Sequence, residues 1–408
     1  MAQLPDAINR LSLPELSDTL GKSLREAERE LENAPGPEDL LDATYADTHR
    51  FPPPEWALPT FVEAAGGGGM TYTPYRGDRA VREAVAHNVS TVLGVPATGS
   101  ADVILTPGTQ GALFVALAAI LSPGDLVLLP DPDYLSTERM LRYFGARVER
   151  IPMIWPDESA TGRGTRPTLD LDALERAAAN KPRLMVFSHP NNPTGAIYGQ
   201  DTIEAIARLA QQHDFTVIAD ELYTRLVYEN EPFYHLAAVD GLAERTVTLL
   251  GPSKTESLSG YRLGVAVGPK DLVDAMEDLQ SVSALRAPAY AQHLLTHWIA
   301  EDQEFLAKKL VEYQALRDTT VEKINTSSVL RVNASYGSAY VFPKILTGAR
   351  DQDVALALKQ KAGVVVNPGY QFGRAGLGHM RLCFAQDEAR WDAALDRIID
   401  VVGSVAPA

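Results

Sequence analysis

Residues 249–268 read LLGPSKTESLSGYRLGVAVG, and a lysine stands in this stretch where an apolar run ends. Lys254 is flanked by small and hydroxylic residues, and Arg262 follows eight positions later, before a second apolar run. A surface loop between two strands is the plain interpretation. The alternative is a buried, reactive amine beside a guanidinium that binds an anion.

The composition excludes several classes of protein. The 408 residues suffice for two packed domains. A net charge of −16 argues against a general nucleic-acid binder, which would present a basic face, and the apolar runs are too short to cross a bilayer. The single cysteine, Cys383, cannot form an intramolecular disulfide, and the first residues do not resemble a signal peptide. We therefore expect a cytoplasmic protein without a nucleic-acid or membrane partner.

Apolar runs alternate with amphipathic helical segments through the middle of the chain. This alternation predicts an α/β domain with a mostly parallel sheet, and ligands of such sheets gather at the carboxyl ends of the strands. The expected strands are 103–105, 125–130, 146–153, 183–190, 215–220 and 246–250, with helices over 110–121, 135–145 and 201–213.

The two ends of the chain have a different order of elements. A polar helix is expected over 14–33, and a long helix over 302–325 precedes short strands that mix with helices over 351–361 and 387–402. This mixed order predicts a smaller α+β domain. We expect a large domain over 61–295, a small C-terminal domain over 296–408, and an N-terminal segment, 1–60, associated with the small domain.

Several of the expected strands end in polar residues. The stretch TPGTQGAL, 106–113, leaves a strand and opens a helix, so its free N–H groups and the helix dipole offer an anion site. Asn192 follows another strand, and Asp220 and Tyr223 follow a third. Each has an ordinary structural explanation when it is taken singly: a tight turn, a loop amide, a helix cap or a core aromatic.

Taken together with Lys254 and Arg262, these residues supply what pyridoxal phosphate needs. The cofactor's aldehyde forms a Schiff base with a lysine, and its ring nitrogen stays protonated beside a carboxylate. Its 3′-oxygen needs donors, and its phosphate needs arginine and backbone N–H groups. A lysine is tolerated at the end of the apolar run because its amine is converted to a neutral or delocalised imine with the cofactor's aldehyde.

From about Tyr72 to about residue 400, the order of these motifs resembles the class I/II aminotransferase family, the aspartate-aminotransferase-like group of fold-type I pyridoxal-phosphate enzymes. The resemblance implies a mostly parallel sheet in the large domain plus a smaller α+β domain. It also implies pyridoxal phosphate as cofactor, no metal, and a homodimer with shared active sites. The implied reaction exchanges an amino group between an L-amino acid and a 2-oxo acid.

The resemblance further implies a role for each matching residue. Lys254 is the Schiff-base lysine and moves a proton between the substrate's Cα and the cofactor. Asp220 pairs with the ring nitrogen, Asn192 and Tyr223 bond the 3′-oxygen, and Arg381 in HMRLCFA binds the substrate carboxylate together with Asn192. The remaining cofactor contacts are implied for Gly108, Thr109, Gln110 and Arg262 at the phosphate, Tyr134 against the ring, Tyr72 at the phosphate of the neighbouring subunit, and Ser253 as a further cofactor contact.

Two departures concern the turn that closes over the substrate in this family and a contact to the cofactor's phosphate. The stretch DATYADTHRFPPP has Ala46, Thr48 and His49 where the family commonly carries Gly, Pro and Asp. Either His49 and Arg50 face the pocket or they lie on a loop surface. In addition, Gly251 stands three positions before the lysine, where a Ser or Thr often contacts the phosphate.

A third departure concerns the substrate. Aspartate-specific members bind the distal carboxylate with an arginine of the partner subunit, and the matching position falls near Ser281, with Arg286 close by. The sequence therefore permits a dicarboxylic substrate without indicating one.

Two other functions stay open. The first keeps the cofactor but diverts the reaction to elimination, cyclisation or oxidation of an amino acid, as the TYADTHR segment and the polar loop 155–168 would permit. The second is a regulator with a DNA-binding module. The acidic charge, and the lack of a winged-helix pattern ahead of Tyr72, argue against it.

Overall fold

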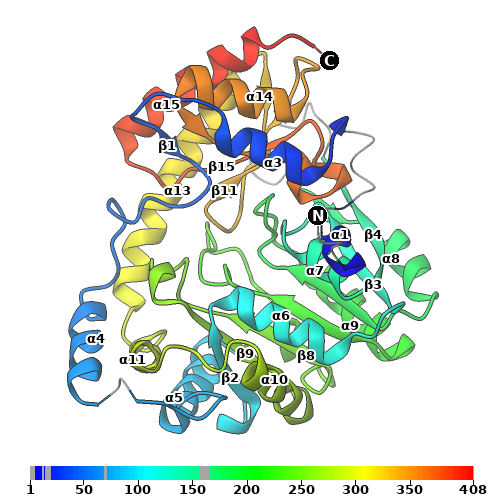
Figure 1. The fold of residues 1–408 in the computed structure, drawn as a ribbon, viewed down its shortest axis with the longest axis vertical. Helices are drawn as coiled ribbons and strands as arrows, with labels where there is room; N and C mark the ends of the chain where they lie inside the picture. Colours follow the sequence, from blue (N-terminus) through cyan, green and yellow to red (C-terminus); the bar gives the residue numbers. More distant parts are fainter. Residues whose placement is uncertain (1–4, 12, 14–19, 69–70, 157–165, 408) are drawn as a thin grey trace.

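The computed structural model describes residues 5–11, 13, 20–68, 71–156 and 166–407. One part of the molecule is a large sheet with helices packed on it, and the other is a smaller group of short strands and long helices (Figure 1). Within the described ranges, no helix combines the length and the apolar character that crossing a membrane requires.

The large sheet has eight strands in the order β2-β9-β8-β7-β6-β3-β4-β5. β9 runs antiparallel to β2 and β8, β5 runs antiparallel to β4, and the other neighbouring strands are parallel. The predicted α/β fold with a mostly parallel sheet is therefore confirmed. The strands are β2 (Val103–Pro107), β3 (Leu126–Asp131), β4 (Arg147–Ile154), β5 (Thr168–Leu169), β6 (Leu184–Ser188), β7 (Thr216–Asp220), β8 (Thr246–Leu250) and β9 (Leu263–Val267).

The side chains of β6 show why helices cover both faces of this sheet. Leu184 and Val186 pack in one core with α6, α7 and α10, whereas Met185 and Phe187 pack in another with α8 and α9. Successive strand residues point to opposite faces, so a strand that is covered on both sides is apolar throughout. The helices are α6 (Thr109–Ile120), α7 (Thr137–Tyr143), α8 (Leu171–Ala178), α9 (Gln200–His213) and α10 (Lys270–Val282).

A third core lies beside β2 and β9 and packs four further helices against them. These helices bring segments from before and after the large sheet together at its edge (Figure 1). They are α4 (Ala57–Gly66), α5 (Arg79–Asn88), α11 (Ala289–Gln292) and α12 (Leu294–His297).

The smaller part is built on α13 (Gln303–Thr326), which confirms the predicted long helix. Its largest sheet has the order β11-β15-β14 and is antiparallel. One core joins α13 to the strands and to α14 and α15. The remaining elements of this part are β10 (Leu330–Arg331), β11 (Tyr340–Val341), β12 (Lys344–Ile345), α14 (Asp351–Ala357) with a π-helical continuation over Leu358–Ala362, β13 (Val364–Val365), β14 (Asn367–Pro368), β15 (Met380–Cys383) and α15 (Glu388–Ser404).

The N-terminal segment contacts both parts. β1 (Leu41–Asp42) pairs in parallel with β13, and Lys359 donates to backbone oxygens near the end of α3 (Leu24–Asn33). By contrast, α1 (Asp6–Arg10) contacts α7 through Arg10. The pairing of β1 supports the proposed association of the N-terminal segment with the small domain. The domain boundaries after residues 60 and 295 stay predictions.

The prediction of one continuous helix over 14–33 is wrong, because the chain leaves the helical conformation before Leu24. α3 begins only at Leu24, because Ser23 adopts an extended conformation and forms a capping box with Glu26. A capping box satisfies free N–H groups at a helix start, so it marks a new helix rather than the middle of an old one. Residues 14–19 of the predicted helix lie outside the described residues.

Candidate active site

A cavity of about 310 Å³ opens where the carboxyl ends of β6, β7 and β8 meet the start of α6. Because these strands are parallel, their carboxyl ends share one edge of the sheet. The smaller part closes the cavity with residues of β11 and β15. Of the residues predicted from the sequence, those that line it are Thr109, Gln110, Tyr134, Asn192, Asp220, Tyr223, Ser253, Lys254, Arg262 and Arg381.

Lys254 stands in the turn that follows β8, and its side chain is half-buried in the cavity wall. Its Nζ makes no hydrogen bond or ion pair with another residue of the described part of the chain. A lysine of this kind has an amine that is free to react. The reactive interpretation of the 249–268 stretch therefore agrees with the geometry better than a surface loop does.

Asp220 ends β7 and lines the same cavity. Its carboxylate accepts a hydrogen bond from the backbone N–H of Leu222 at 3.3 Å, and no cationic side chain of the described residues pairs with it. Burial raises the pKa of Asp220 to about 7, and the nearby Glu221 adds to the shift. The cavity thus contains a carboxyl group that a cation would stabilise.

The start of α6 forms an anion site beside Arg262. α6 has no side-chain N-cap, so its first N–H groups are open at the cavity edge. Gly108 adopts φ +77°, and its N–H donates to the backbone oxygen of Arg262 at 3.0 Å. A Cβ on Gly108 would collide with the Arg262 guanidinium, and one on Gly264 would collide with the backbone of Gly108 and Thr109. Gly108 therefore shapes this site although it does not line the cavity.

The structure explains the departure at Gly251. A Cβ there would lie 2.9 Å from Oγ1 of Thr109, which also lines the cavity. The Thr109 hydroxyl thus occupies the space that a side chain at position 251 would need. A hydroxyl group remains at this corner of the cavity, supplied by α6 instead of by the segment before Lys254.

The two tyrosines predicted from the sequence, Tyr134 and Tyr223, line the cavity. Tyr134 donates a hydrogen bond to Oε1 of Gln110 at 2.8 Å, which fixes its ring beside α6. Tyr223 donates to the hydroxyl of Tyr340 at 3.2 Å. Burial raises the pKa of Tyr223 well above its ordinary value, with the neighbouring Tyr340 adding to the shift, so its hydroxyl stays protonated and can donate.

Arg381 lines the cavity from β15 of the smaller part. Its guanidinium donates to Oδ1 of Asn192 at 2.9 Å, to the backbone oxygen of Thr44 at 2.9 Å and to Oδ1 of Asn367 at 2.5 Å. It also lies 3.9 Å from the ring centroid of Tyr340. The buried Nε has no partner among the described residues. These contacts hold a planar cation in place and leave its Nε–H unsatisfied, as suits a carboxylate ligand.

The structure places His49, Arg50 and Tyr72 away from the cavity. His49 is exposed, Arg50 pairs with Glu312 at 2.8 Å, and neither lines the cavity. The interpretation in which these two face the pocket is therefore wrong, and the loop-surface interpretation holds. Tyr72 is 83 % exposed, and the guanidinium of Arg286 lies 4.4 Å from its ring centroid.

Sequence reasoning missed several residues of the cavity wall. Thr44 and Tyr45 belong to the DATYADTHR stretch that departs from the family pattern. They lie a few positions before His49 and Arg50, the residues considered for the pocket in the sequence analysis. No local signal distinguishes the others, since each is an ordinary residue of a helix, a strand end or a turn. The complete set of unpredicted residues is Thr44, Tyr45, Leu113, Leu135, Ser188, Leu222, Ser259 and Tyr340.

Comparison with known proteins identifies this arrangement. The family "Aminotransferase class I and II" matches residues 42–398. An aspartate/prephenate aminotransferase of Thermus thermophilus is 33% identical over 368 residues, which is 90% of this chain and 91% of the relative. An aromatic-amino-acid aminotransferase 2 of Thermococcus litoralis is 30% identical over 355 residues, 86% of this chain and 89% of the relative. A crystal structure of an aspartate aminotransferase from Rhodobacter sphaeroides is similar at a TM-score of 0.84 and 36% identity, and covers 92% of this chain and 94% of its own.

The fold and its cavity are thus those of an aspartate aminotransferase-like enzyme. The chain belongs to the class I and II aminotransferases, a family that uses pyridoxal phosphate and transfers amino groups between amino acids and oxo acids. The resemblance, the fold and the enzyme class that the sequence predicted are confirmed.

Proposed function

We propose that this cavity binds pyridoxal phosphate and that Lys254 is the residue that reacts with it. The observation that carries the proposal is the pairing of a free amine at Lys254 with an unpaired carboxyl at Asp220 in one cavity. Neither group has a charged partner among the described residues, and the cofactor provides an aldehyde for one and a ring cation for the other.

The donor set fits the other groups of the cofactor as well. The open N–H groups of α6, the hydroxyls of Thr109 and Ser253, and the Arg262 guanidinium would hold the phosphate. Asn192 and Tyr223 would donate to the 3′-oxygen, and the ring of Tyr134, fixed by Gln110, would pack against the cofactor. Gly108 would keep the backbone close to the Arg262 side chain.

When bound, the cofactor supplies an electron sink that lets the substrate's Cα release its proton. The chain's own residues would do the remaining work. Arg381 and Asn192 would bind and orient the α-carboxylate, and Asp220 would keep a proton on the ring nitrogen. Lys254 Nζ would take the proton from Cα and return it to the cofactor side, acting as general base and then general acid.

We also propose that the enzyme is a homodimer. Tyr72 is 83 % exposed, and the nearby helix α10 exposes 83 % of Val282. A second subunit that covered this surface would bring Tyr72 to the partner's cavity, as the family resemblance implies. Light scattering should give twice the mass of the 408-residue chain, and Tyr72→Phe should weaken cofactor binding without changing the mass.

The names of the relatives point to aspartate and aromatic amino acids as amino donors and to prephenate, a 2-oxo acid, as an acceptor. We propose a donor among these amino acids. Among the described residues, the cations that line the cavity are Lys254, Arg262 and Arg381, and each already has a proposed partner. Arg286 lies outside the cavity, where its Nη1 donates to Thr73 O at 2.5 Å. A dicarboxylic donor would therefore need a cation from a second subunit, whereas an aromatic donor would not.

The test uses the purified protein with pyridoxal phosphate. Borohydride reduction followed by peptide mass spectrometry should place the adduct on Lys254, and amino acids should then convert the cofactor to pyridoxamine phosphate. An adduct at another lysine would refute the assigned site. Release of ammonia or peroxide without pyridoxamine phosphate would instead indicate the diverted chemistry.

The buried Cys383, which has no disulfide partner, accords with the predicted cytoplasmic location.

A further inference from the structure

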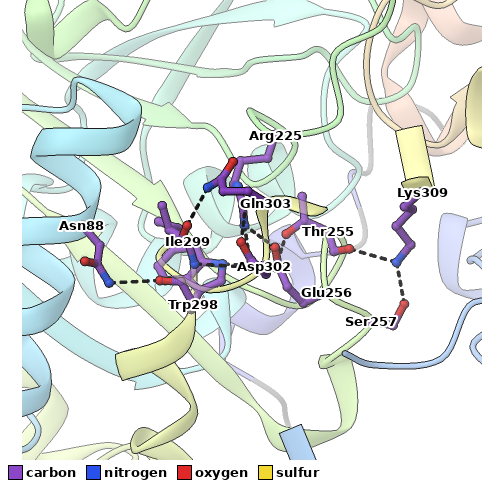
Figure 2. Close-up of polar contacts among 10 residues, drawn as sticks. All are labelled: Asn88, Arg225, Thr255, Glu256, Ser257, Trp298, Ile299, Asp302, Gln303 and Lys309. Carbon is purple, nitrogen blue, oxygen red and sulfur yellow. Dashed lines mark hydrogen bonds and ion pairs between the residues drawn. The ribbon is translucent and has the colours of Figure 1, made fainter. Parts of the chain in front are cut away.

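A buried polar network includes Thr255, Glu256 and Ser257, the three residues that follow Lys254 in the chain (Figure 2). Its charged members are two cations, Arg225 and Lys309, and two anions, Glu256 and Asp302. Each is at most 7 % exposed, and none lines the cavity. A buried charge cluster of this kind is costly to desolvate and contributes little to stability by itself. Its position next to the reactive lysine suggests a different use.

Lys309 is the member that supports the backbone beyond Lys254. Its Nζ donates to the backbone oxygen of Thr255 at 2.8 Å and to Oγ of Ser257 at 2.8 Å. Thr255 is the residue next to Lys254, and Ser257 has the unusual φ of +57°. A serine is rarely found in this backbone region without supporting contacts. Lys309 therefore holds the turn from which the Lys254 side chain extends.

The other three charges bond the same segment to the start of α13. Arg225 pairs with Glu256 and donates to both carboxylate oxygens of Asp302, at 2.9 Å and 2.5 Å. Trp298 Nε1 donates to Glu256 at 3.1 Å. Asp302 immediately precedes α13, so these bonds join the residues after Lys254 to the base of this helix in one rigid unit (Figure 2).

The same helix carries the part of the molecule that holds Arg381. Figure 1 shows α13 extending from the large sheet to α14 and α15. Tyr313 and Ile324 of α13 share a core with Leu382 and Cys383 of β15, next to Arg381. A rigid-body movement of α13 would therefore shift Arg381 at one end and Lys309 at the other.

We propose that Lys309 is a positioning residue, which orients Lys254 through Thr255 and Ser257 and couples that orientation to the placement of α13. The inference rests on the proposed role of Lys254. Lys309 does not touch the cavity, so it would act on the reaction only through the backbone that carries Lys254. Binding of a carboxylate at Arg381 would thereby adjust the amine that moves the proton.

The first experiment compares Lys309→Met with Lys308→Met in the cofactor-loaded enzyme. The two lysines are adjacent on α13, but Lys308 is exposed and serves as the matched control. For Lys309→Met we expect kcat to fall by about 10²-fold with KM within about threefold, because misplacement of a reacting group slows chemistry more than binding. The circular dichroism of the bound cofactor should weaken, and Lys308→Met should change neither quantity. A normal kcat and an unchanged cofactor signal in Lys309→Met would overturn the proposal.

A second experiment separates positioning from a general structural defect. In a Lys254→Ala background, methylamine replaces the missing amine, and proton removal no longer depends on the backbone behind position 254. Adding Lys309→Met to this background should change the amine-rescued rate by less than about twofold. A loss as large as that in the Lys254 enzyme would show that Lys309 acts elsewhere and would refute the inference.

If Lys309→Met does not fold, Ser257→Ala provides the same test with a smaller change. It removes one acceptor of the Lys309 ammonium and leaves the Thr255 contact in place. We expect a reduction in kcat of about 3–10-fold, again absent from the amine-rescued reaction. An unchanged kcat would overturn the proposal. Failure of the proposed function would look different, because borohydride would then fix no adduct at Lys254 even in the unsubstituted protein.

Discussion

The guanidinium of Arg381 donates a hydrogen bond to the side-chain oxygen of Asn192 over 2.9 Å, although 189 positions separate the two residues in the chain. Asn192 follows β6 of the large sheet, and Arg381 lies on β15 of the smaller part. The backbone of Thr44, from the N-terminal segment, accepts a second bond. The end of the cavity proposed to bind the substrate carboxylate is thus assembled from three separate regions of the chain.

Replacing Arg381 with lysine should weaken binding of the amino acid more than it slows the reaction. Lysine lacks the planar fork that grips a carboxylate with two bonds, and a hydrogen bond to a charged group contributes about 1.5–3 kcal/mol. Steady-state kinetics should therefore show KM raised by about 10–100-fold. Arg50→Lys is the control, since Arg50 lies outside the cavity. A KM unchanged in Arg381→Lys would remove this residue from the substrate site.

Lys254→Ala should leave a folded protein that has lost its chemistry. We expect the rate of amino transfer to fall by at least about 10³-fold, because the general base is absent, and borohydride should fix no cofactor at this position. Far-ultraviolet circular dichroism checks the fold. Lys270→Ala, at an exposed lysine that pairs with Asp274, should keep full activity. Residual rates close to those of the unsubstituted enzyme would contradict the assignment.

Asp220 should make the cofactor-free protein less stable as the pH rises. Burial raises its folded-state pKa to about 7, above the ordinary value of 3.8, so the folded state binds more protons between these values. Stability therefore falls as the pH rises from about 4 to about 7, by at most about 4 kcal/mol. Urea unfolding at about pH 5 and about pH 8 should show that Asp220→Asn loses this part of the pH dependence.

Added pyridoxal phosphate should remove the same pH dependence in the unsubstituted protein. A ring cation beside the carboxylate favours its charged form and lowers its pKa. If the stability of Asp220→Asn and of the unsubstituted protein depended on pH in the same way without cofactor, burial of the Asp220 carboxyl would not be the cause of the fall in stability with rising pH.

Gly264→Ala should destabilise the proposed phosphate site. Its Cβ would collide with the backbone of Gly108 and Thr109 at the start of α6, which cannot move away without disturbing the sheet. We expect a loss of about 1–3 kcal/mol in urea unfolding and weaker binding of pyridoxal phosphate. Gly199→Ala is the matched control, because φ is −71° there and nothing lies within 4 Å of the added Cβ. Equal stability of the two variants would contradict the close approach.

The fold and most of the residues proposed for the candidate active site could be predicted from the sequence alone. Strands such as β6 are apolar throughout because helices cover both of their faces, and that pattern is visible in the chain. Parallel strands bring their carboxyl ends to one edge, so Asn192, Asp220 and Lys254 could be placed together from their positions after successive strands. The order and spacing of the motifs were sufficient to place these residues together, because β6, β7 and β8 are neighbours in the sheet as well as successive strands in the chain.

Only the tertiary structure decided which residues of the other regions reach the cavity. Thr44 and Tyr45 line it while His49 and Arg50 do not, Thr109 fills the space beside Gly251, and Lys309 supports the turn behind Lys254. Each of these outcomes depends on packing between segments that are far apart in the chain. A sequence pattern reports which face of its own element a residue occupies, but the space left for a side chain is set by the distant element packed against it.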